Sequence, residues 1–282
     1  MPGTLYVVAT PIGNLEDVTA RALRVLKEVA VVAAEDTRRT AHLLGRYAIT
    51  TPTTSLHEHN ESKKSAAIVG RLMRGEDVAL VSDAGTPLIS DPGQHLIRSA
   101  IAEGIRVEPI PGPSAVMAAL SASGAPTAPF TFLGFPPTRL NDRKRWLEQL
   151  GRLRHTVVFF EAPHRLRDTL AQIGQCVGDC RVTVCRELTK IHEQLVRGPI
   201  STVLAGGLSE IGEATVVVEL GHSTDIGQVE PPSAESLQAE LGEIAKSKGV
   251  SRRKALGILA RKHNMTPNQV YDAIEVAKKL AK

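Results

Sequence analysis

The sequence predicts an α/β protein with two domains and a small helical extension, and three features of its pattern carry that prediction. Through the first 120 residues, short apolar runs alternate with segments of helical spacing, which is typical of a mostly parallel sheet with helices on both faces. A stretch rich in Ser, Ala, Gly and Pro at 121–129 indicates a linker, after which strands and helices resume. Beyond a second linker at 221–232, only helical spacing remains. The expected domains are therefore 1–120, 126–222 and 233–282.

The first domain repeats a unit of one strand followed by one helix. Its central run, Val78 to Val81, has four consecutive apolar residues, as expected for a strand that is buried on both faces. The expected strands are 4–9, 31–34, 53–56, 78–81 and 107–110. The expected helices are 19–28, a segment that ends at 46, 61–74, 94–103 and one that has Pro113 in its first turn.

The second domain and the extension show weaker patterns. Strands are expected at 130–134, 156–161, 181–186 and 212–220, with helices at 141–150 and 163–176. An alternating stretch at 187–197 fits a further strand. Helices of the extension are expected at 234–246, 251–263 and 266–279, the last opened by a capping box of Thr266 and Gln269.

Composition places the chain among ordinary globular proteins. Of its 282 residues, 42% are hydrophobic and 23% are charged. No apolar run is long enough to span a bilayer and the amino terminus lacks a signal-peptide pattern, so we expect a soluble cytoplasmic protein. Cys176, Cys180 and Cys185 match neither a zinc site nor a redox pair and are expected to be free thiols. His57 and His59 lack a third ligand, so no metal is expected.

The net charge of +4 is distributed unevenly along the chain. Residues 246–282 carry ten Lys and Arg against two Asp and Glu, a net of +8, which leaves −4 for residues 1–245. A basic appendage on an acidic body indicates a polyanionic partner. The tail residues expected to contact such a partner are Arg252, Arg253, Lys254, Arg261 and Lys262.

A turn-rich stretch from Ser82 to Gly93 follows the central strand and is the best candidate for a binding loop. In a parallel α/β sheet, ligands bind at the carboxyl ends of the strands. Gly85 and Pro87 turn the backbone and leave amides exposed, and Asp83 is the best candidate for a ligand contact. The sequence contains neither of the two glycine-rich phosphate-binding motifs, G-x-x-x-x-G-K-[ST] and G-x-G-x-x-G. A site for a di- or triphosphate is therefore not expected. A nucleoside with a zwitterionic amino-acid end suits a lining of amides, carbonyls and small side chains.

Several longer motifs resemble one known family. They are V-A-T-P-I-G-N-L-E-D at 8–17, A-A-E-D-T-R at 33–38, S-D-A-G-T-P-L-I-S-D-P-G at 82–93, P-G-P-S-A at 111–115, F-L-G-F-P at 132–136, F-F-E-A-P-H-R at 159–165 and C-R-E-L-T-K-I-H-E at 185–193. Together they resemble the tetrapyrrole-methylase superfamily, and the last motif narrows the resemblance to the ribosomal RNA small subunit methyltransferase I family. The resemblance runs from the first strand to about Leu220.

The resemblance implies two α/β domains of the tetrapyrrole-methylase type with S-adenosylmethionine in the cleft between them, no metal, and a homodimer. It implies 2′-O-methylation of a cytidine ribose at the decoding centre of 16S ribosomal RNA in the 30S subunit. The expected cofactor contacts are Pro11, Ile12, Gly13, Ser82, Asp83, Ala84, Gly85, Ser90, Asp91, Ser114, Ala115, Phe160, Glu161, Ala214 and Thr215. Further RNA contacts are expected at Arg186 and Lys190. The superfamily offers no single shared base, so the catalytic candidates are Glu161, His164, Glu187 and Lys190.

Two alternatives stand beside this interpretation. A methyltransferase of this superfamily could act on a small tetrapyrrole, but a porphyrinoid acid gives no reason for a basic helical tail. An RNA-binding module without catalysis would explain the tail, but it gives no reason for an organised crevice around Asp83. Binding of S-adenosylmethionine separates the binding module from both enzymes, and the choice of substrate separates the enzymes from each other.

Overall fold

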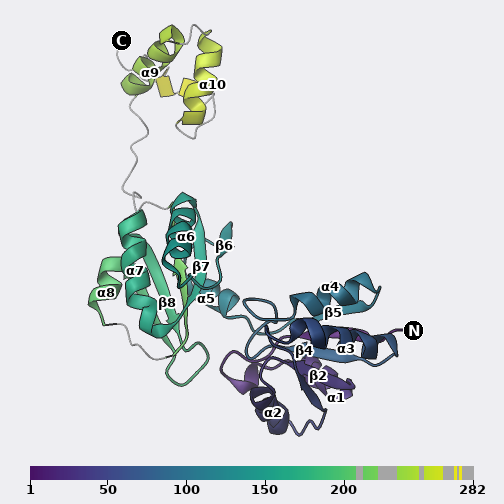
Figure 1. Ribbon diagram of the computed structural model, residues 1–282. Coiled ribbons are helices and arrows are strands. Elements are labelled where there is room, and N and C mark those ends of the chain that lie inside the picture. Colours follow the sequence, from purple (N-terminus) through teal and green to yellow (C-terminus); the bar gives the residue numbers. More distant parts are fainter. Residues whose placement is uncertain (208–211, 222–233, 248–250, 263–269, 272, 275–282) are drawn as a thin grey trace. The chain divides into compact units, whose positions relative to one another are not determined.

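The computed structural model describes residues 1–207, 212–221, 234–247, 251–262, 270–271 and 273–274 (Figure 1). The chain divides into two compact units, residues 1–222 and 223–282. The larger unit contains two five-stranded sheets with helices packed on them, whereas the described residues of the smaller unit are helical. The predicted α/β class with a helical extension is therefore confirmed.

The first sheet is parallel throughout, as the sequence predicted. Its strands are β1 (Thr4–Val8), β2 (Val31–Ala34), β3 (Thr53–Ser55), β4 (Val78–Val81) and β5 (Arg106–Ile110). They run in the order β3-β2-β4-β1-β5, and every pair in that order is parallel. The carboxyl ends of all five strands consequently meet at one edge, where the loops of the candidate site begin.

Helices cover both faces of this sheet (Figure 1). They are α1 (Ala20–Glu28), α2 (Thr37–Arg46), α3 (Glu61–Met73) and α4 (Gln94–Ala102), with a short 3-10 helix at Leu15–Asp17. Along β2, Val32 and Ala34 face the core shared with α1 and α2, while Val31 and Ala33 face the core shared with α3 and α4. This two-sided burial explains why the strands are continuous apolar runs.

The second sheet is mixed. Its strands are β6 (Phe130–Phe132), β7 (Thr156–Glu161), β8 (Arg181–Arg186), β9 (Gln194–Pro199) and β10 (Ala214–Val218), in the order β6-β7-β10-β8-β9. β6 and β7 are parallel, and the other three pairs are antiparallel. The alternating stretch at 187–197 is a strand only from Gln194 onward, and residues 187–193 form the connection from β8. Because β10 is antiparallel to β7 and β8, its amino end lies beside their carboxyl ends.

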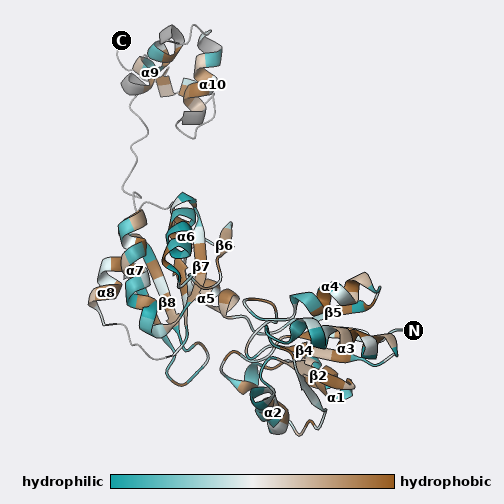
Figure 2. Ribbon diagram, in the orientation of Figure 1, coloured by the Kyte–Doolittle hydropathy of each residue, from teal (hydrophilic) through white to brown (hydrophobic). Residues whose placement is uncertain are grey.

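Helices α6 (Leu140–Arg152), α7 (Pro163–Val177) and α8 (Ile200–Ala205) pack on one face of the second sheet. In Figure 2 the strands β7 and β8 are largely brown and α6 is largely teal, as expected for an apolar sheet under a polar outer helix. Helix α5 (Ala115–Ser123) packs on the opposite face, against Val158, Cys185 and Val217.

Helix α5 corrects the expected linker at 121–129. The helix continues to Ser123, and both Ser123 and Ala125 are buried, so this stretch is packed against the second sheet and is not a free connection. The helix also begins later than expected: Ser114 caps it and Ala115 is its first residue, which leaves Pro113 outside. Small residues at 121–125 reflect close packing here, a pattern that sequence alone cannot separate from a linker. The expected domain bounds stay a prediction.

The smaller unit contains α9 (Ala234–Ser247) and α10 (Arg252–Lys262), joined in one apolar core with Val270 and Ile274. The expected capping box at Thr266 and Gln269 lies outside the described residues. Of the basic tail residues proposed for RNA, Lys254 has a described side chain and it is exposed; the side chains of Arg252, Arg253, Arg261 and Lys262 lie outside the described part. Among the described helices, none is both long and apolar enough to cross a membrane.

Candidate active site

A pocket of about 230 Å³ opens where the loops of the first sheet meet the end of the second. The first sheet contributes the loops after β1, β2, β4 and β5. The second contributes the loop after β6, the ends of β7 and β8, the loop after β8, and the start of β10. Ligand-binding loops at the carboxyl edge of the parallel sheet were predicted from sequence, and the pocket lies at that edge.

The loops after β1 and β4 are joined to each other by backbone hydrogen bonds. The Thr10 amide donates to the Gly85 carbonyl at 2.8 Å, and the Gly85 amide donates to the Thr10 carbonyl at 3.0 Å. Gly85 has φ +81°, and a Cβ there would lie 3.3 Å from Cγ2 of Ile12. Glycine at this position therefore provides both a left-handed turn and a close approach of the two loops.

The loop after β1 also contacts the loop after β8. The Asn14 amide donates to Oγ1 of Thr189 at 2.9 Å. A Cβ on Gly13 would lie 2.6 Å from Cγ of Lys190 and 2.8 Å from the Leu188 carbonyl oxygen, closer than real Cβ atoms come. Gly13 is thus required for the two loops to meet at the pocket wall.

Two loops at the pocket hold non-glycine residues in the left-handed region. Leu88 and Ser90 have φ of 75° and 73°, and Glu187 and Thr189 have φ of 48° and 68°. Such backbone is costly for side-chain-bearing residues, above all for a β-branched one such as Thr189. Ser90 and Glu187 line the pocket. Strained backbone that gathers around one pocket is characteristic of functional sites.

The pocket is rich in carboxylates. It is lined by Glu35, Asp83, Asp91, Glu161, Glu187 and Glu213. Burial raises the pKa of Asp91 to about 6, with Glu35, Asp83 and Glu213 adding to the shift, while a hydrogen bond from Ser82 opposes it. Burial and the neighbouring Asp83 likewise raise the pKa of Glu35. These shifts mean that the pocket favours a cationic ligand over a neutral or anionic one.

One cation faces these carboxylates from α2. Nη1 of Arg39 lies 3.4 Å from Oδ2 of Asp83, and Oδ1 of Asp83 accepts a hydrogen bond from the Asp36 amide at 3.0 Å. Asp83 is therefore held in place from two sides at the mouth of the first-sheet loops. Across the described part of the chain, no group of three or more His, Cys, Asp or Glu is arranged to hold a metal ion.

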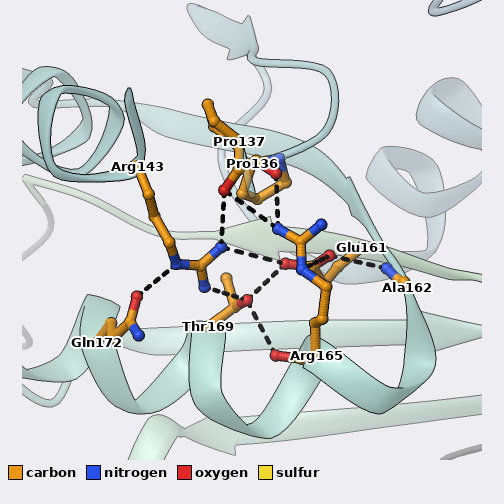
Figure 3. Close-up of polar contacts among 8 residues, drawn as sticks. All are labelled: Pro136, Pro137, Arg143, Glu161, Ala162, Arg165, Thr169 and Gln172. Carbon is orange, nitrogen blue, oxygen red and sulfur yellow. Dashed lines mark hydrogen bonds and ion pairs between the residues drawn. The ribbon is translucent and has the colours of Figure 1, made fainter. Parts of the chain in front are cut away.

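Glu161, the last residue of β7, lies in a buried cluster of polar groups (Figure 3). Its side chain is 0% exposed. One carboxylate oxygen accepts from the Ala162 amide at 2.8 Å and lies 3.4 Å from Nε of Arg165. The other accepts a hydrogen bond from the Thr169 hydroxyl and lies 3.9 Å from Nη1 of Arg143.

The two arginines of this cluster also hold an aromatic wall of the pocket. Arg165 donates to the Pro136 carbonyl at 2.6 Å and Arg143 donates to the Pro137 carbonyl at 3.4 Å (Figure 3). The residue before these prolines, Phe135, lines the pocket, and its ring centroid lies 5.3 Å from that of Phe160. The buried charges thus fix the loop that presents Phe135.

Comparison of the sequence with known proteins assigns the chain to a family. The model of the family "Tetrapyrrole (Corrin/Porphyrin) Methylases" matches residues 4–204. The "Ribosomal RNA small subunit methyltransferase I" of Bacillus subtilis is 41% identical over 276 residues, which cover 97% of this chain and 94% of the relative. The protein of the same name from Halalkalibacterium halodurans is 49% identical over 219 residues, 77% of this chain and 76% of the relative. The chain belongs to the ribosomal RNA small subunit methyltransferase I family.

Solved structures share the fold of this family at much lower identity. A diphthine synthase superposes with a TM-score of 0.62 at 14% identity and covers 77% of this chain and 90% of its own. A uroporphyrin-III-C-methyltransferase from Thermus thermophilus gives 0.54 at 21% identity, with coverage of 80% and 97%. At these identities the likeness establishes the fold alone, which is the predicted tetrapyrrole-methylase type.

In this family member, the structure brings most of the expected cofactor contacts together. The pocket is lined by Ile12, Asp83, Ala84, Gly85, Ser90, Asp91, Ser114, Ala115, Phe160, Glu161, Ala214 and Thr215. Pro11 and Gly13 line an adjoining depression that shares Ile12, Asp83 and Ala84 with the pocket. Ser82 lines neither: it is 4% exposed, and its hydroxyl donates to the Ala84 carbonyl at 3.4 Å.

The catalytic candidates separate in the structure. Glu187 and Lys190 line both the pocket and the depression, and Nζ of Lys190 lies 2.9 Å from Oε1 of Glu187. That hydrogen bond holds the pKa of Glu187 below its ordinary value. Glu161 is enclosed in its buried cluster, and His164 is exposed and outside the lining of the pocket. Arg186, expected to contact RNA, is 7% exposed and donates to Oε1 of Gln194 at 2.6 Å.

Sequence reasoning missed several residues that line the pocket, among them Glu35, Arg39 and Phe135. Glu35 directly follows β2, and Arg39 lies in the first turn of α2. The rule that pointed to Asp83, a position just after a parallel strand, would have found Glu35 as well. Phe135 follows β6 and is 53% exposed, and no local pattern distinguishes it from a core aromatic.

Proposed function

We propose that the chain is an S-adenosylmethionine-dependent methyltransferase that modifies the 2′-hydroxyl of a cytidine ribose at the decoding centre of 16S ribosomal RNA in the 30S subunit. The observation that carries this proposal is the relationship over nearly the full chain to proteins named ribosomal RNA small subunit methyltransferase I. A tetrapyrrole substrate is not favoured, because the relatives that are 39–49% identical carry the ribosomal name.

The chemistry of the pocket fits S-adenosylmethionine. This molecule carries a positive sulfonium and an ammonium group, and six carboxylates line the pocket, of which Asp91 and Glu35 have raised pKa values. Ala84 and Gly85 leave room for close approach to the backbone, and Ile12 and Phe160 supply apolar surface. The amino terminus of α5, at Ala115, offers free amides of the kind that bind a carboxylate.

The residues that would hold the cofactor follow from this lining. Asp83 and Asp91 would hold its positively charged groups, Ser114 and Ala115 its carboxylate, and Ile12 its apolar surface. When bound, S-adenosylmethionine supplies a methyl group on a positively charged sulfur. The fixed position of Asp83, between Arg39 and the Asp36 amide, reduces the reorganisation needed on binding.

The remaining task of the protein is to bring the ribose hydroxyl into line and to manage its proton. Positioning of the reacting groups within about 3–3.5 Å supplies a large part of the rate of such a displacement. Lys190 and Glu187 would orient the hydroxyl; this part of the proposal is supported by their position in the pocket lining and by the contact of 2.9 Å between Nζ of Lys190 and Oε1 of Glu187. Since the pKa of Glu187 is lowered, it is a weak base, and the pair contributes chiefly by orientation.

Two further parts of the proposal concern partners and location. The tail residues of 246–282, with their net charge of +8, are proposed to contact ribosomal RNA, and a second copy of the chain is the proposed partner in a homodimer. A ribosomal substrate implies a cytoplasmic location. Sedimentation of the purified protein tests the dimer, and a monomer at micromolar concentration would contradict it.

The methyl-transfer assay tests the function itself. Purified protein and labelled S-adenosylmethionine are incubated with 30S subunits from cells that lack this activity, with 50S subunits and a precorrin as parallel substrates. The proposal expects label in 30S subunits only. Label in the precorrin, or no label in any substrate with a protein that binds S-adenosylmethionine, would overturn it.

A further inference from the structure

Positive charge is concentrated in one segment of the second domain that includes α6 and the start of α7. Residues 139–167 contain eight Lys and Arg against three Asp and Glu, a net of +5. Because residues 1–245 as a whole are net −4, all the others in that range sum to −9. An acidic body with one basic segment near a pocket is the charge distribution expected for a polyanion-binding surface.

The basic side chains of this segment divide into an inward and an outward set. Arg143 and Arg165 point into the Glu161 cluster (Figure 3), and Arg145 is paired with Asp142. The outward set consists of the exposed Arg139, Lys144, Arg152, Arg154 and Arg167. Arg152 is the last residue of α6, and Arg154 just beyond it donates to the Gly151 and Leu153 carbonyls. The other three, Arg139, Lys144 and Arg167, have no recorded ion pair within the described part of the chain. We call these three residues the α6–α7 basic surface.

Two residues of this surface are close along the chain to residues that line the pocket or the depression beside it. Arg139 caps the amino end of α6, four residues after Phe135, which lines the pocket. Arg167 lies about one helical turn after Pro163, which lines the adjoining depression. Helices α6 and α7 are joined by the hydrogen bond from Nε of Arg143 to Oε1 of Gln172 at 2.6 Å. The helices that carry the three cations are therefore held in a fixed relative position.

An exposed aromatic side chain, Phe135, lines the pocket and precedes Arg139 by four residues in the chain. Phe135 is 53% exposed, which is unusual for a phenylalanine that is held by a buried network. Its loop is fixed by the carbonyl contacts of Arg143 and Arg165 (Figure 3). Single-stranded RNA is recognised in general by basic grooves with aromatic rings on which bases stack.

We propose that the α6–α7 basic surface binds backbone phosphates of the substrate RNA and that Phe135 stacks on the base whose ribose enters the pocket. This inference rests on the proposed function, and it adds the face of the molecule on which RNA lies. Arg143 and Arg165 hold the loop that carries Phe135, and the cations of the α6–α7 basic surface contact phosphates. RNA is the occupant that charge favours, since the surface offers three cations without paired carboxylates in the domain that forms one side of the pocket.

The surface is tested with two triple variants of equal charge. One carries Arg139→Ala, Lys144→Ala and Arg167→Ala; the control carries Lys27→Ala, Lys63→Ala and Arg98→Ala, exposed cations on the first domain. Binding to unmodified 30S subunits is measured for each at several salt concentrations, together with calorimetric binding of S-adenosylmethionine and thermal melting. Melting and cofactor binding should match the wild type in both variants.

For the α6–α7 triple variant, we expect at least a tenfold loss of affinity for 30S subunits at low salt. The slope of log affinity against log salt should become shallower by about 2, since each lost phosphate contact removes about 0.7–0.9. The control should keep the wild-type slope. Equal slopes for the two triple variants would overturn the proposal, because they would mean that only net charge matters. Failure of wild-type methyl transfer to 30S subunits, with this binding difference intact, would instead overturn the proposed function.

Stacking is tested by Phe135→Leu with Phe135→Tyr as its conservative partner. Leucine keeps apolar volume in the pocket but offers no ring, so KM for 30S subunits should rise about tenfold while the Kd for S-adenosylmethionine is unchanged. Tyrosine should restore KM to within about twofold of the wild type. An unchanged KM in Phe135→Leu, or the same loss in both variants, would show that no base stacks on this ring.

Discussion

At the scale of single residues, the pocket is characterised by carboxylates whose positions and pKa values are set by neighbouring protein groups. Asp83 is fixed by the Asp36 amide and by Arg39, and Asp91 is partly buried with a raised pKa of about 6. Carboxylates in such surroundings are costly to keep ionised unless a positive charge joins them. Their arrangement therefore argues for a cationic ligand more strongly than any single residue does.

The first prediction concerns Asp83→Asn. Asparagine keeps an oxygen that can accept the Asp36 amide but removes the negative charge. The loss of a charge-assisted contact costs about 1.5–3 kcal/mol, so affinity for S-adenosylmethionine should fall by roughly tenfold to a hundredfold. Calorimetry measures this, with the exposed Asp17→Asn as control. An affinity like that of the wild type would remove Asp83 from the cofactor site.

The second prediction follows from the pKa of Asp91. The ionised carboxylate prefers a bound cation, and it is present above a pH of about 6 and lost below it. Affinity for S-adenosylmethionine should therefore rise from pH 5 to pH 7.5, by up to about tenfold. Binding to Asp91→Asn should vary much less over the same range. A wild-type affinity that is flat with pH, or that falls toward pH 7.5, would contradict this assignment.

At the scale of elements, the junction of β7 and α7 is held by charge. The side chain of Glu161 is 0% exposed, and it accepts hydrogen bonds from the Ala162 amide and from the Thr169 hydroxyl of α7. It also forms ion pairs with Arg143 and Arg165. This geometry suits a positioning residue better than a base that must exchange protons with substrate. The stability of the second domain should therefore depend on Glu161.

The third prediction separates these two roles. Glu161→Gln leaves Arg143 and Arg165 without their carboxylate, and breaking a buried pair in this way costs about 3–5 kcal/mol. Urea unfolding should show that loss, whereas the exposed Glu148→Gln on α6 should stay within about 0.5 kcal/mol of the wild type. A Glu161→Gln protein of wild-type stability that has lost only turnover would make Glu161 a catalytic group.

The fourth prediction concerns the contact between the loops after β1 and β8. In Gly13→Ala, the new methyl group would collide with Lys190 and the Leu188 carbonyl, so the loops must separate. Affinity for S-adenosylmethionine and turnover should both fall. Gly45→Ala in α2 meets nothing within 4 Å and should stabilise the protein by about 0.5–1 kcal/mol. If Gly13→Ala had wild-type turnover, the close approach of these loops would have no part in activity.

At the scale of the whole molecule, sequence reasoning predicted the first sheet better than the second. Runs such as Val78–Val81 are buried on both faces and could be recognised directly. The stretch after β8 alternates like a strand but is a loop with positive φ at Glu187 and Thr189, and its shape depends on the distant Asn14. Helix α8, which packs beside β9, was not predicted, because its six residues are too few to show a helical spacing of apolar residues.

The site shows the same division. Asp83 and Ile12 were found because they follow strands of the parallel sheet, and they line the pocket. Ser82 and Arg186 also stand at strand ends, but their side chains are buried. Adjacent positions on a strand point to opposite sides, so a sequence motif marks the neighbourhood of a site but not which of its residues face the ligand.

The central claim is that this chain places a methyl group on a ribose hydroxyl of small-subunit RNA. Its most direct test is mass spectrometry of nuclease fragments, and of the nucleosides derived from them, of 16S ribosomal RNA from cells that lack this activity, complemented with the wild type or with Asp83→Asn. We predict that 2′-O-methylcytidine appears at one site in the decoding centre with the wild type and is strongly reduced with the variant. An unchanged nucleoside profile with the wild type, or a methyl group on a base instead of a ribose, would contradict the account.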